Sequence, residues 1–361
     1  MLTKSIHSYN SRQTQTNKVK MSFKVFILIS FLSINIHSIL GQQGKVRCLF
    51  QDSIEHGYTC VLELMKSDSV NDDVEGVHLP GKTDEDVRRV EGNWQDLVNI
   101  PPLICNVYIN TEDIDLNSCL IERVTESSFK GCKKLKSLKL ERNHITQIDE
   151  NSFLENPELE NIELWSNQLT TLPGNLFINQ KKLQNLAIDS NRIVNLPNNI
   201  FKSLRSLKTI NLSENRIPAL NHAWFETLDN LENLYLHFNQ IEDLPVGIFT
   251  HMSKLTQFSI YSNRLRVIHS HSFGLHPTLQ FAWLQMNQIE AIDEKFILNT
   301  SVSEISMNFN VCAHGSIVDN SFSRVIMRIA LRTCFENYEK LMAGPLTKLL
   351  IDRDLSSKVN V

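Results

Sequence analysis

A single motif recurs every 24 residues through the middle of this 361-residue chain. Seven asparagines keep this spacing: Asn143, Asn167, Asn191, Asn215, Asn239, Asn263 and Asn287. Seven phenylalanines keep it too: Phe129, Phe153, Phe177, Phe201, Phe225, Phe249 and Phe273. Repetition at a fixed period of this size indicates a solenoid, in which one structural unit is stacked many times. The repeat therefore overrides the two-domain organisation that the chain length alone would suggest.

Each repeat contains a nine-residue frame that ends on the asparagine, as in residues 183–191. Apolar residues occupy its fourth and sixth positions, here Leu186 and Ile188, and mostly polar residues stand between them. This alternation predicts a short β-strand with one buried face. One such turn cannot bury its own apolar side chains, so successive turns must share a core. We expect each asparagine to bond backbone groups of its own turn and the next, and the phenylalanines to form an aromatic column on the convex side.

These frames, some of which continue into a Leu-Pro pair such as Leu196-Pro197, resemble the extracellular, 24-residue class of leucine-rich repeat. The resemblance implies an α/β repeat solenoid, a horseshoe with a parallel β-sheet on its concave face and a cap at each end. We count about nine turns over residues 111–310, the last of them 23 residues after its neighbour. Cys119 replaces the asparagine of the first turn, as the family pattern allows. Such a resemblance specifies fold far better than function.

The ends of a repeat stack expose its core unless other segments cover them. We therefore expect an N-terminal cap at residues 42–110 and a C-terminal cap with helices at residues 311–361. An amphipathic helix is predicted to begin near Ser321 and to run towards Leu341.

Two pairs of cysteines lie in these caps and are predicted disulfides in an oxidising compartment: Cys48 with Cys60, and Cys312 with Cys334. Cys105 lies on the phenylalanine register and Cys119 on the asparagine register, so both are expected to be buried. A bridge from Cys105 to Cys132 is one alternative, and three small buried hydrophobic side chains are the other. We favour the second for Cys119.

The caps extend the resemblance. The N-terminal cap is similar to the entry region of insect secreted leucine-rich repeat proteins. The segments that carry this resemblance are Cys48-Leu-Phe, Tyr58-Thr-Cys60, Gly76-Val-His78, Asp84-Glu-Asp-Val87 and Ile100-Pro101. The C-terminal cap is similar to the way these proteins end, on Asn310-Val-Cys312 and Leu331-Arg-Thr-Cys334-Phe-Glu-Asn-Tyr338. The family includes the mosquito leucine-rich immune proteins, which act in innate defence by binding partner proteins. This chain lacks the extended coiled coil of the long immune members and the membrane segment of Toll-type receptors.

Residues 1–41 are predicted to be a signal peptide with its leader. A basic, acid-free leader precedes an apolar stretch at 23–40, and Gly41 is the expected cleavage position. Translation from Met21 and an uncleaved anchor of about 18 apolar residues are the alternatives. We expect a secreted, extracellular protein without a membrane span in its mature chain.

The rest of the chain is acidic, because five of the 36 basic residues but none of the 40 acidic ones lie in residues 1–41. Nucleic acid, which requires a basic face, is therefore not an expected partner. No catalytic motif such as HExxH, GxSxG or a P-loop is present, so we predict no enzymatic activity, cofactor or metal. The local histidines His269, His271 and His276 are expected in a solvated loop around Phe273.

The register predicts that positions three, five and seven of each frame face outward from the concave sheet. The early turns present mostly charged and polar residues there: Asp113, Asp115, Asn117, Ser137, Lys139, Glu141 and Glu163. The candidate partner-binding residues are Trp165, Tyr235, His237, Phe238, Tyr261, Phe281 and Trp283, with Met286 and Phe309 near the edge. Exposed aromatic clusters often mark interfaces, although aromatic residues also stabilise neighbouring strands and a cap could cover them.

Two sequons, at Asn211 and Asn299, predict a glycoprotein. The combined hypothesis is a secreted, non-enzymatic module that recognises a protein partner through its concave face in innate immunity. A role in extracellular matrix, adhesion or developmental signalling is the alternative, and an enzyme or enzyme inhibitor is a third class. A glycan or a microbial surface are further candidate ligands.

Overall fold

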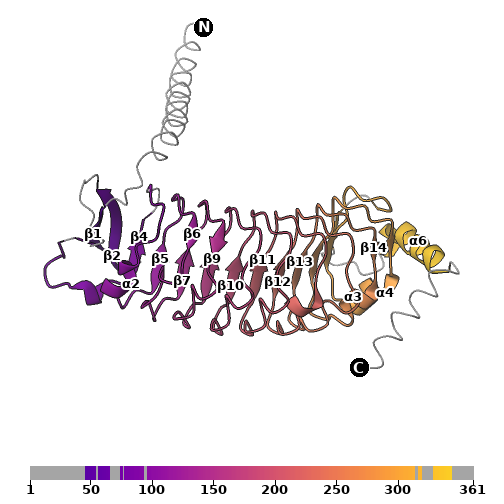
Figure 1. Ribbon diagram of the computed structural model, residues 1–361. Helices are drawn as coiled ribbons and strands as arrows, with labels where there is room; N and C mark the ends of the chain where they lie inside the picture. Colours follow the sequence, from indigo (N-terminus) through magenta and orange to yellow (C-terminus); the bar gives the residue numbers. More distant parts are fainter. Residues whose placement is uncertain are drawn as a thin grey trace, which may run out of the picture. The chain divides into compact units, whose positions relative to one another are not determined.

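The computed structural model describes residues 45–53, 56–65, 74–75, 77–92, 96–313, 316–318 and 328–343. The predicted signal peptide and the expected helix start at Ser321 lie outside these residues. The described repeats form a stack of turns, each of which contributes one short strand (Figure 1). Neighbouring strands from β2 to β17 pair in parallel within a sheet of 14 described strands. The parallel-strand solenoid predicted from the repeat is confirmed.

The repeat strands are three residues long and follow the 24-residue period, except for the last interval. They are β5 (Asp113–Asp115), β7 (Ser137–Lys139), β9 (Asn161–Glu163), β10 (Asn185–Ala187), β11 (Thr209–Asn211), β12 (Asn233–Tyr235), β13 (Gln257–Ser259), β15 (Phe281–Trp283) and β17 (Glu304–Ser306). Equivalent residues pair across the sheet, as Leu186 does with Ile210. The central side chain of each strand is buried, while the flanking residues belong to the concave surface.

Strand β4 (Arg89–Glu91) pairs with β5 at the same 24-residue offset, so the regular array begins before residue 111. The frame does not reveal this turn, because Gly92 stands where later turns carry their second apolar residue. A Cβ atom at Gly92 would lie only 2.8 Å from Leu116 Cδ2, so any side chain at this position would displace the end of the Leu116 side chain. The placement of Cys105 on the phenylalanine register is the sequence signal of this additional turn.

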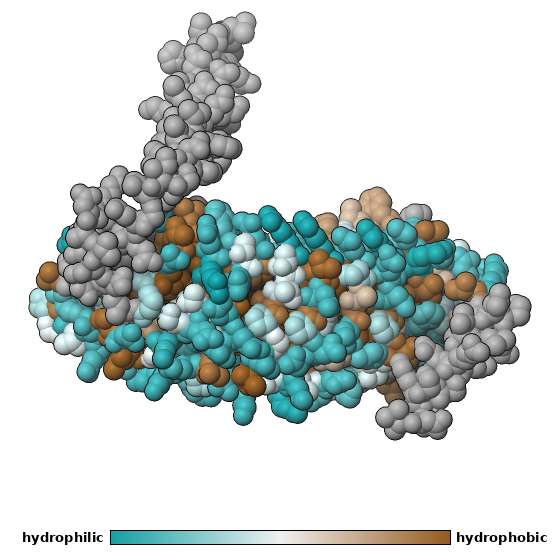
Figure 2. Space-filling model, viewed as in Figure 1, coloured by the Kyte–Doolittle hydropathy of each residue, from teal (hydrophilic) through white to brown (hydrophobic). Residues whose placement is uncertain are grey.

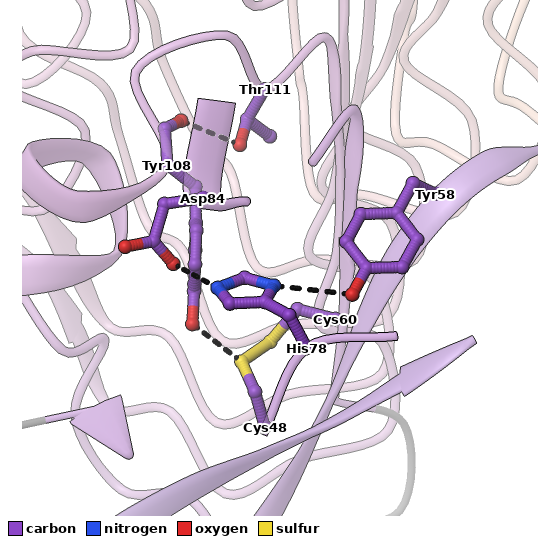
Figure 3. Close-up of a disulfide and its surroundings, with 7 residues drawn as sticks. All are labelled: Cys48, Tyr58, Cys60, His78, Asp84, Tyr108 and Thr111. Carbon is purple, nitrogen blue, oxygen red and sulfur yellow. Dashed lines mark hydrogen bonds and ion pairs between the residues drawn. A yellow bond between two sulfur atoms is a disulfide. The ribbon is translucent and has the colours of Figure 1, made fainter. Parts of the chain in front are cut away.

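Further strands extend the sheet at both ends. They are β1 (Lys45–Ser53), β2 (Gly57–Met65) and β3 (Val74–Glu75) at one end, and β18 (Ser316–Val318), antiparallel to β17, at the other. In the amino-terminal cap the imidazole of His78 lies between Asp84 and Tyr58 (Figure 3). The distances are 2.9 Å from Nε2 to Asp84 Oδ1 and 3.1 Å from Nδ1 to the Tyr58 hydroxyl. These three residues, distant in sequence, fix the chain around the Cys48–Cys60 disulfide.

The return segments that join the strands contain short helices and ladders. The helices are η1 (Asp84–Asp86), α2 (Leu103–Val107), η2 (His222–Trp224), α3 (Ser270–Phe273) and α4 (Glu294–Asn299). The ladders pair β6 (Arg123–Val124) with β8 (Gln147–Ile148), and β14 (Val267–Ile268) with β16 (Ala291–Ile292). The seven repeat phenylalanines are all buried, and ring contacts join Phe129, Phe153 and Phe177 at one end and Phe249 to Phe273 further along. Hydrophilic residues cover most of the visible surface of the repeats, with hydrophobic ones interspersed (Figure 2).

The repeat asparagines form a buried hydrogen-bond ladder. Asn167 Nδ2 donates to the carbonyl oxygens of Leu164, in its own turn, and Leu140, in the preceding turn, at 3.0 and 2.9 Å. Its Oδ1 accepts from the Ile145 amide at 3.0 Å, also in the preceding turn. The expected bond to the following turn is therefore wrong in direction. The frame fixes the spacing of the turns but not the direction of these bonds, which depends on how the turns stack in three dimensions.

Helix α6 (Arg332–Met342) packs against β16 on the return side of the stack. Tyr338 and His269 share a hydrogen bond of 3.1 Å, and Asn337 Nδ2 donates to the Glu290 carbonyl oxygen at 2.9 Å. Within the described part of the chain, this cap helix thus lies against the return segments rather than against the concave sheet.

Three disulfides link Cys48 to Cys60, Cys105 to Cys132 and Cys312 to Cys334. The first and third are the pairs expected from the sequence, and the second settles an alternative that the sequence left open. Cys119 is buried in the stack, where its Sγ lies 2.8 Å from the Gly92 carbonyl oxygen.

Candidate functional site

Four ring-bearing residues gather on the concave surface beside β12 and β13. We call them the Tyr–His cluster: Tyr235, His237, Phe238 and Tyr261. Tyr235 ends β12, His237 and Phe238 follow it, and Tyr261 follows β13 one turn later. Adjacent strands therefore bring residues 24 positions apart into direct contact.

The rings of His237 and Tyr261 stack with their centroids 4.5 Å apart and an interplanar angle of 7°. Phe238 meets the Tyr261 ring edge-on at 5.2 Å, and the Tyr235 hydroxyl donates to Gln257 Oε1 at 3.1 Å. Burial lowers the pKa of His237, although the nearby Glu214 carboxylate opposes the shift. The imidazole is therefore neutral at physiological pH, and the cluster presents a rigid, mostly apolar surface.

Phe281 and Trp283, at the two ends of β15, form a second group that we call the Phe–Trp pair. Their rings stack at 5.9 Å, and Trp283 Nε1 donates to Glu304 Oε1 at 3.2 Å. Ser259 stands between Tyr235 and Trp283 in the strand register, so the rings form two groups rather than one continuous patch. The sequence predicts the face of each ring but not this separation.

Trp165 lies apart from both groups, on the turn of β9. The Arg142 guanidinium lies 4.7 Å from the centre of its ring, and its Nε1 donates to Glu163 Oε2 at 3.2 Å. Its surroundings are therefore charged rather than aromatic.

Three large apolar side chains line the edge of the concave face near the two aromatic groups. Phe238, Met286 and Phe309 are 47%, 50% and 71% exposed, and their φ angles are 52°, 56° and 59°. Bulky residues seldom adopt this left-handed conformation. The same frame position has positive φ in every motif-bearing turn, so the fold itself imposes the geometry that projects these side chains outward.

Four carboxylates follow one another across the early turns. We call them the carboxylate row: Glu141, Glu163, Asp189 and Glu214. Burial raises the pKa of Glu141 to about 7, and the carboxylates of Glu163 and Asp115 add to the shift. Burial likewise raises the pKa of Asp189 to about 6, with contributions from Glu214 and Glu163. Asp189 and Glu214 were not among the residues singled out from the sequence, although frame positions seven and eight would have identified both.

Other charged residues of the early concave face form ion pairs with one another. Arg89 pairs with Glu91, Asp113 and Asp115, and its Nη2 lies 2.7 Å from Asp115 Oδ2. Lys139 Nζ also approaches Asp115 Oδ2, at 3.9 Å. Arg89 comes from the additional turn at β4, so its part in this face was not predicted.

The two sequons have different surroundings. Asn211 is half-buried on β11, and its Oδ1 accepts from the Ser213 amide at 3.1 Å and from the Ser213 hydroxyl at 2.6 Å. Asn299 is half-buried at the end of α4 on the return side. Their modification stays a prediction.

The expectation of a solvated histidine loop is wrong for His276, which is only 1% exposed beside the Phe273 ring. His271 is exposed, and His269 contacts Tyr338. The core closes over His276 because its backbone pairs with Thr300 of the next turn. Among the described residues, no three His, Cys, Asp or Glu side chains come together as metal ligands, and no helix has the length and apolar character needed to cross a bilayer.

Comparison with known proteins agrees with this architecture. The family model described as "Leucine rich repeat" matches residues 109–169, 181–241 and 229–289. A search of curated proteins finds no significant match. The chain thus contains leucine-rich repeats, and its strand array is the leucine-rich repeat solenoid.

Three solved structures illustrate the likeness. The APL1 leucine-rich repeat domain has 19% identity and a TM-score of 0.57, over 74% of this chain and 65% of that one. A chain of the octameric complex of Latrophilin 3, Unc5D and FLRT2 has 21% identity and a TM-score of 0.54, over 63% and 68%. A chain of the Drosophila Toll–Spatzle complex has 20% identity and a TM-score of 0.51, over 72% and 38%. The chain thus spans less than two thirds of the first and third of these, and at such identities the likeness shows the fold alone.

Proposed function

We propose that this chain is a secreted, non-enzymatic protein-binding module that recognises a protein partner through its concave sheet in innate immunity. The observation that carries the proposal is the Tyr–His cluster, which stacks half-buried rings on an open face of a rigid sheet. Tyrosine and tryptophan are enriched at interface hot spots, because they bury a large area at a small cost in side-chain entropy. The Phe–Trp pair and the apolar edge enlarge the same surface.

Secretion is supported by the three disulfides, since such bonds persist in oxidising compartments. A role in defence is supported by similarity to the Toll–Spatzle complex, a molecular hub in Drosophila development and innate immunity. An adhesion, matrix or developmental role is the alternative, supported by similarity to the Latrophilin 3, Unc5D and FLRT2 assembly. Induction of expression by infection would favour the first role, and stage-restricted expression would favour the second.

The test replaces three aromatic residues of the concave face, as Tyr235→Ala, Tyr261→Ala and Trp283→Ala in one variant. Partner capture from the extracellular fluid of the source organism should fall by about tenfold or more, as expected when hot-spot residues are truncated. The matched control truncates three exposed apolar residues outside the concave sheet: Leu154→Ala, Ile178→Ala and Val194→Ala. Equal capture by the native chain and a correctly folded aromatic variant would overturn the proposal.

A further inference from the structure

The carboxylate row has no ionic partner within the described residues. None of the ion pairs there involves Glu141, Glu163, Asp189 or Glu214. Of the neighbouring cations, Arg89 and Lys139 contact Asp115, and Arg142 lies on the Trp165 ring. Four carboxylates thus cross four successive turns of one face without an ion pair of their own among the described residues.

Glu141 is the most buried member of the row. Its side chain is 8% exposed, and its Oε2 atom has no hydrogen-bond partner in the structure. An unpaired carboxylate is costly at a buried position, and its ionised form requires a cation or hydrogen-bond donors. No hydrogen bond or ion pair within the described residues reaches that atom, although the charge of Lys139 opposes the rise in the pKa of Glu141. A cation brought by a ligand would therefore stabilise the ionised group.

The spacing of the row identifies the kind of ligand. Glu141, Trp165 and Asp189 occupy the same frame position on three successive turns, which lie about 4.8 Å apart. An indole thus lies between two carboxylates, and the Arg142 guanidinium of this chain already lies 4.7 Å from the centre of its ring. The surface therefore accommodates a basic side chain, and the flanking carboxylates suit the charged head of a further lysine or arginine. Ala187, at the end of β10 two residues before Asp189, has only a small side chain to fill that part of the concave surface.

We propose that the carboxylate row binds lysine and arginine side chains of a basic polypeptide segment of the partner, and that the Tyr–His cluster holds apolar side chains of the same segment. The assignment rests on the proposed function and adds the chemistry of the partner. From β7 to β13 the face spans five strand intervals, about 24 Å. An extended segment of about seven residues covers that distance, whereas a small cation would fill only part of it.

The pH dependence of binding follows from the groups around the row. Glu141 faces Asp115 and Glu163 on the adjoining turns and Lys139 on its own. A cation favours the ionised carboxylates, so affinity is greatest above the pKa of about 7 for free Glu141 and falls as the pH drops through it.

Asp189, which faces Glu163, Glu214 and Ser190, adds a second loss of affinity near its pKa of about 6. His237 faces Glu214, and burial lowers the pKa of His237; its protonation on acidification adds a positive charge that opposes a basic ligand. All these groups therefore weaken binding on acidification.

The probe is a library of random peptides of about ten residues, long enough to span the face. The row variant combines Glu141→Gln, Glu163→Gln, Asp189→Asn and Glu214→Gln. The control variant makes an equal change of charge on the return segments, by Glu122→Gln, Glu155→Gln, Glu226→Gln and Asp229→Asn. Peptides selected on the native chain above pH 7 should be basic and should also carry apolar residues. They should lose about tenfold or more in affinity for the row variant but not for the control.

Several outcomes would overturn the assignment. They are selection of acidic or neutral peptides, equal binding by the row and control variants, and affinity that does not fall on acidification. Calorimetry with spermine or calcium alone provides a further test. If either cation binds the carboxylate row more tightly than the selected peptides do, the row is a site for small cations. If the row variant retains partner capture that the aromatic variant loses, this inference fails and the proposed function stands. If neither variant alters capture, both fail.

Discussion

Glu141 is held at the concave surface of β7 with one carboxylate oxygen unsatisfied. Its folded-state pKa of about 7 lies above the ordinary value of 4.5, so the native state binds this proton more tightly than the unfolded chain does. The native state therefore loses stability as the pH rises from about 4.5 to about 7, and the loss persists at higher pH. The ionised Glu141 carboxylate therefore lowers the free energy of unfolding, and a cation supplied by a ligand would remove this loss.

The substitution Glu141→Gln should raise the free energy of unfolding at about pH 8 by on the order of 2 kcal/mol and change it little near pH 4. The reason is that glutamine fills the site without a charge. Urea unfolding at both pH values measures the difference, with Glu122→Gln as the exposed control. An equal effect at the two pH values would show that packing, not ionisation, governs this position.

At the level of the element, each turn is joined to the preceding one by its asparagine. Asn215 Nδ2 donates to the carbonyl oxygens of Ile188 and Leu212, and its Oδ1 accepts from the Ile193 amide. These backbone groups are buried and would lose their partner together. The ladder therefore contributes more to stability than an isolated surface hydrogen bond.

We expect Asn215→Ala to lower the free energy of unfolding by about 3 kcal/mol, because it leaves several buried backbone groups unsatisfied. The matched control is Asn185→Ala, which removes an exposed amide bonded to the Asn161 side chain at 2.7 Å. That change should cost less than about 1 kcal/mol. Chemical denaturation of both variants makes the comparison, and similar losses would argue against the ladder as a principal support.

For the whole molecule, the charge pattern and the ring pattern of the concave sheet meet at β11. Asn211 lies there, between the carboxylate row and the Tyr–His cluster, whereas Asn299 lies on the return side. A glycan at Asn211 would lie at the junction and hinder a partner segment that crosses it. Its occupancy therefore controls how much of the face can act as one surface.

Glycopeptide mass spectrometry of the protein purified from its source should find both sequons modified. Removal of the site by Asn211→Gln should then strengthen binding of the basic peptides several-fold, because it uncovers the junction. The matched variant, Asn299→Gln, should leave binding unchanged. No gain on removal of an occupied Asn211 site would mean that the peptide does not cross β11.

Much of this architecture could be predicted because each of the nine turns carries the same pattern of apolar residues, which can be buried in only one way. Leu186 and Ile188, with their counterparts in other turns, can be buried only by stacking, so period, strand position and outward-facing residues follow from spacing alone. The burial of the seven phenylalanines follows for the same reason. The turn at β4 was missed because its pattern is broken by Gly92, whose lack of a side chain is meaningful only beside Leu116.

The sequence by itself determined which residues share a face, since strand alternation and a fixed period are local properties of the chain. Tertiary structure alone decided which of them touch: the stacking of His237 on Tyr261, the isolation of Trp165 and the burial of His276. The same holds for the unpaired state of the carboxylate row, because Arg89 joins Asp113 and Asp115 only through a turn that the motif does not reveal. Contacts and ionisation depend on distances across turns and on the exclusion of water, which no residue specifies without its neighbours.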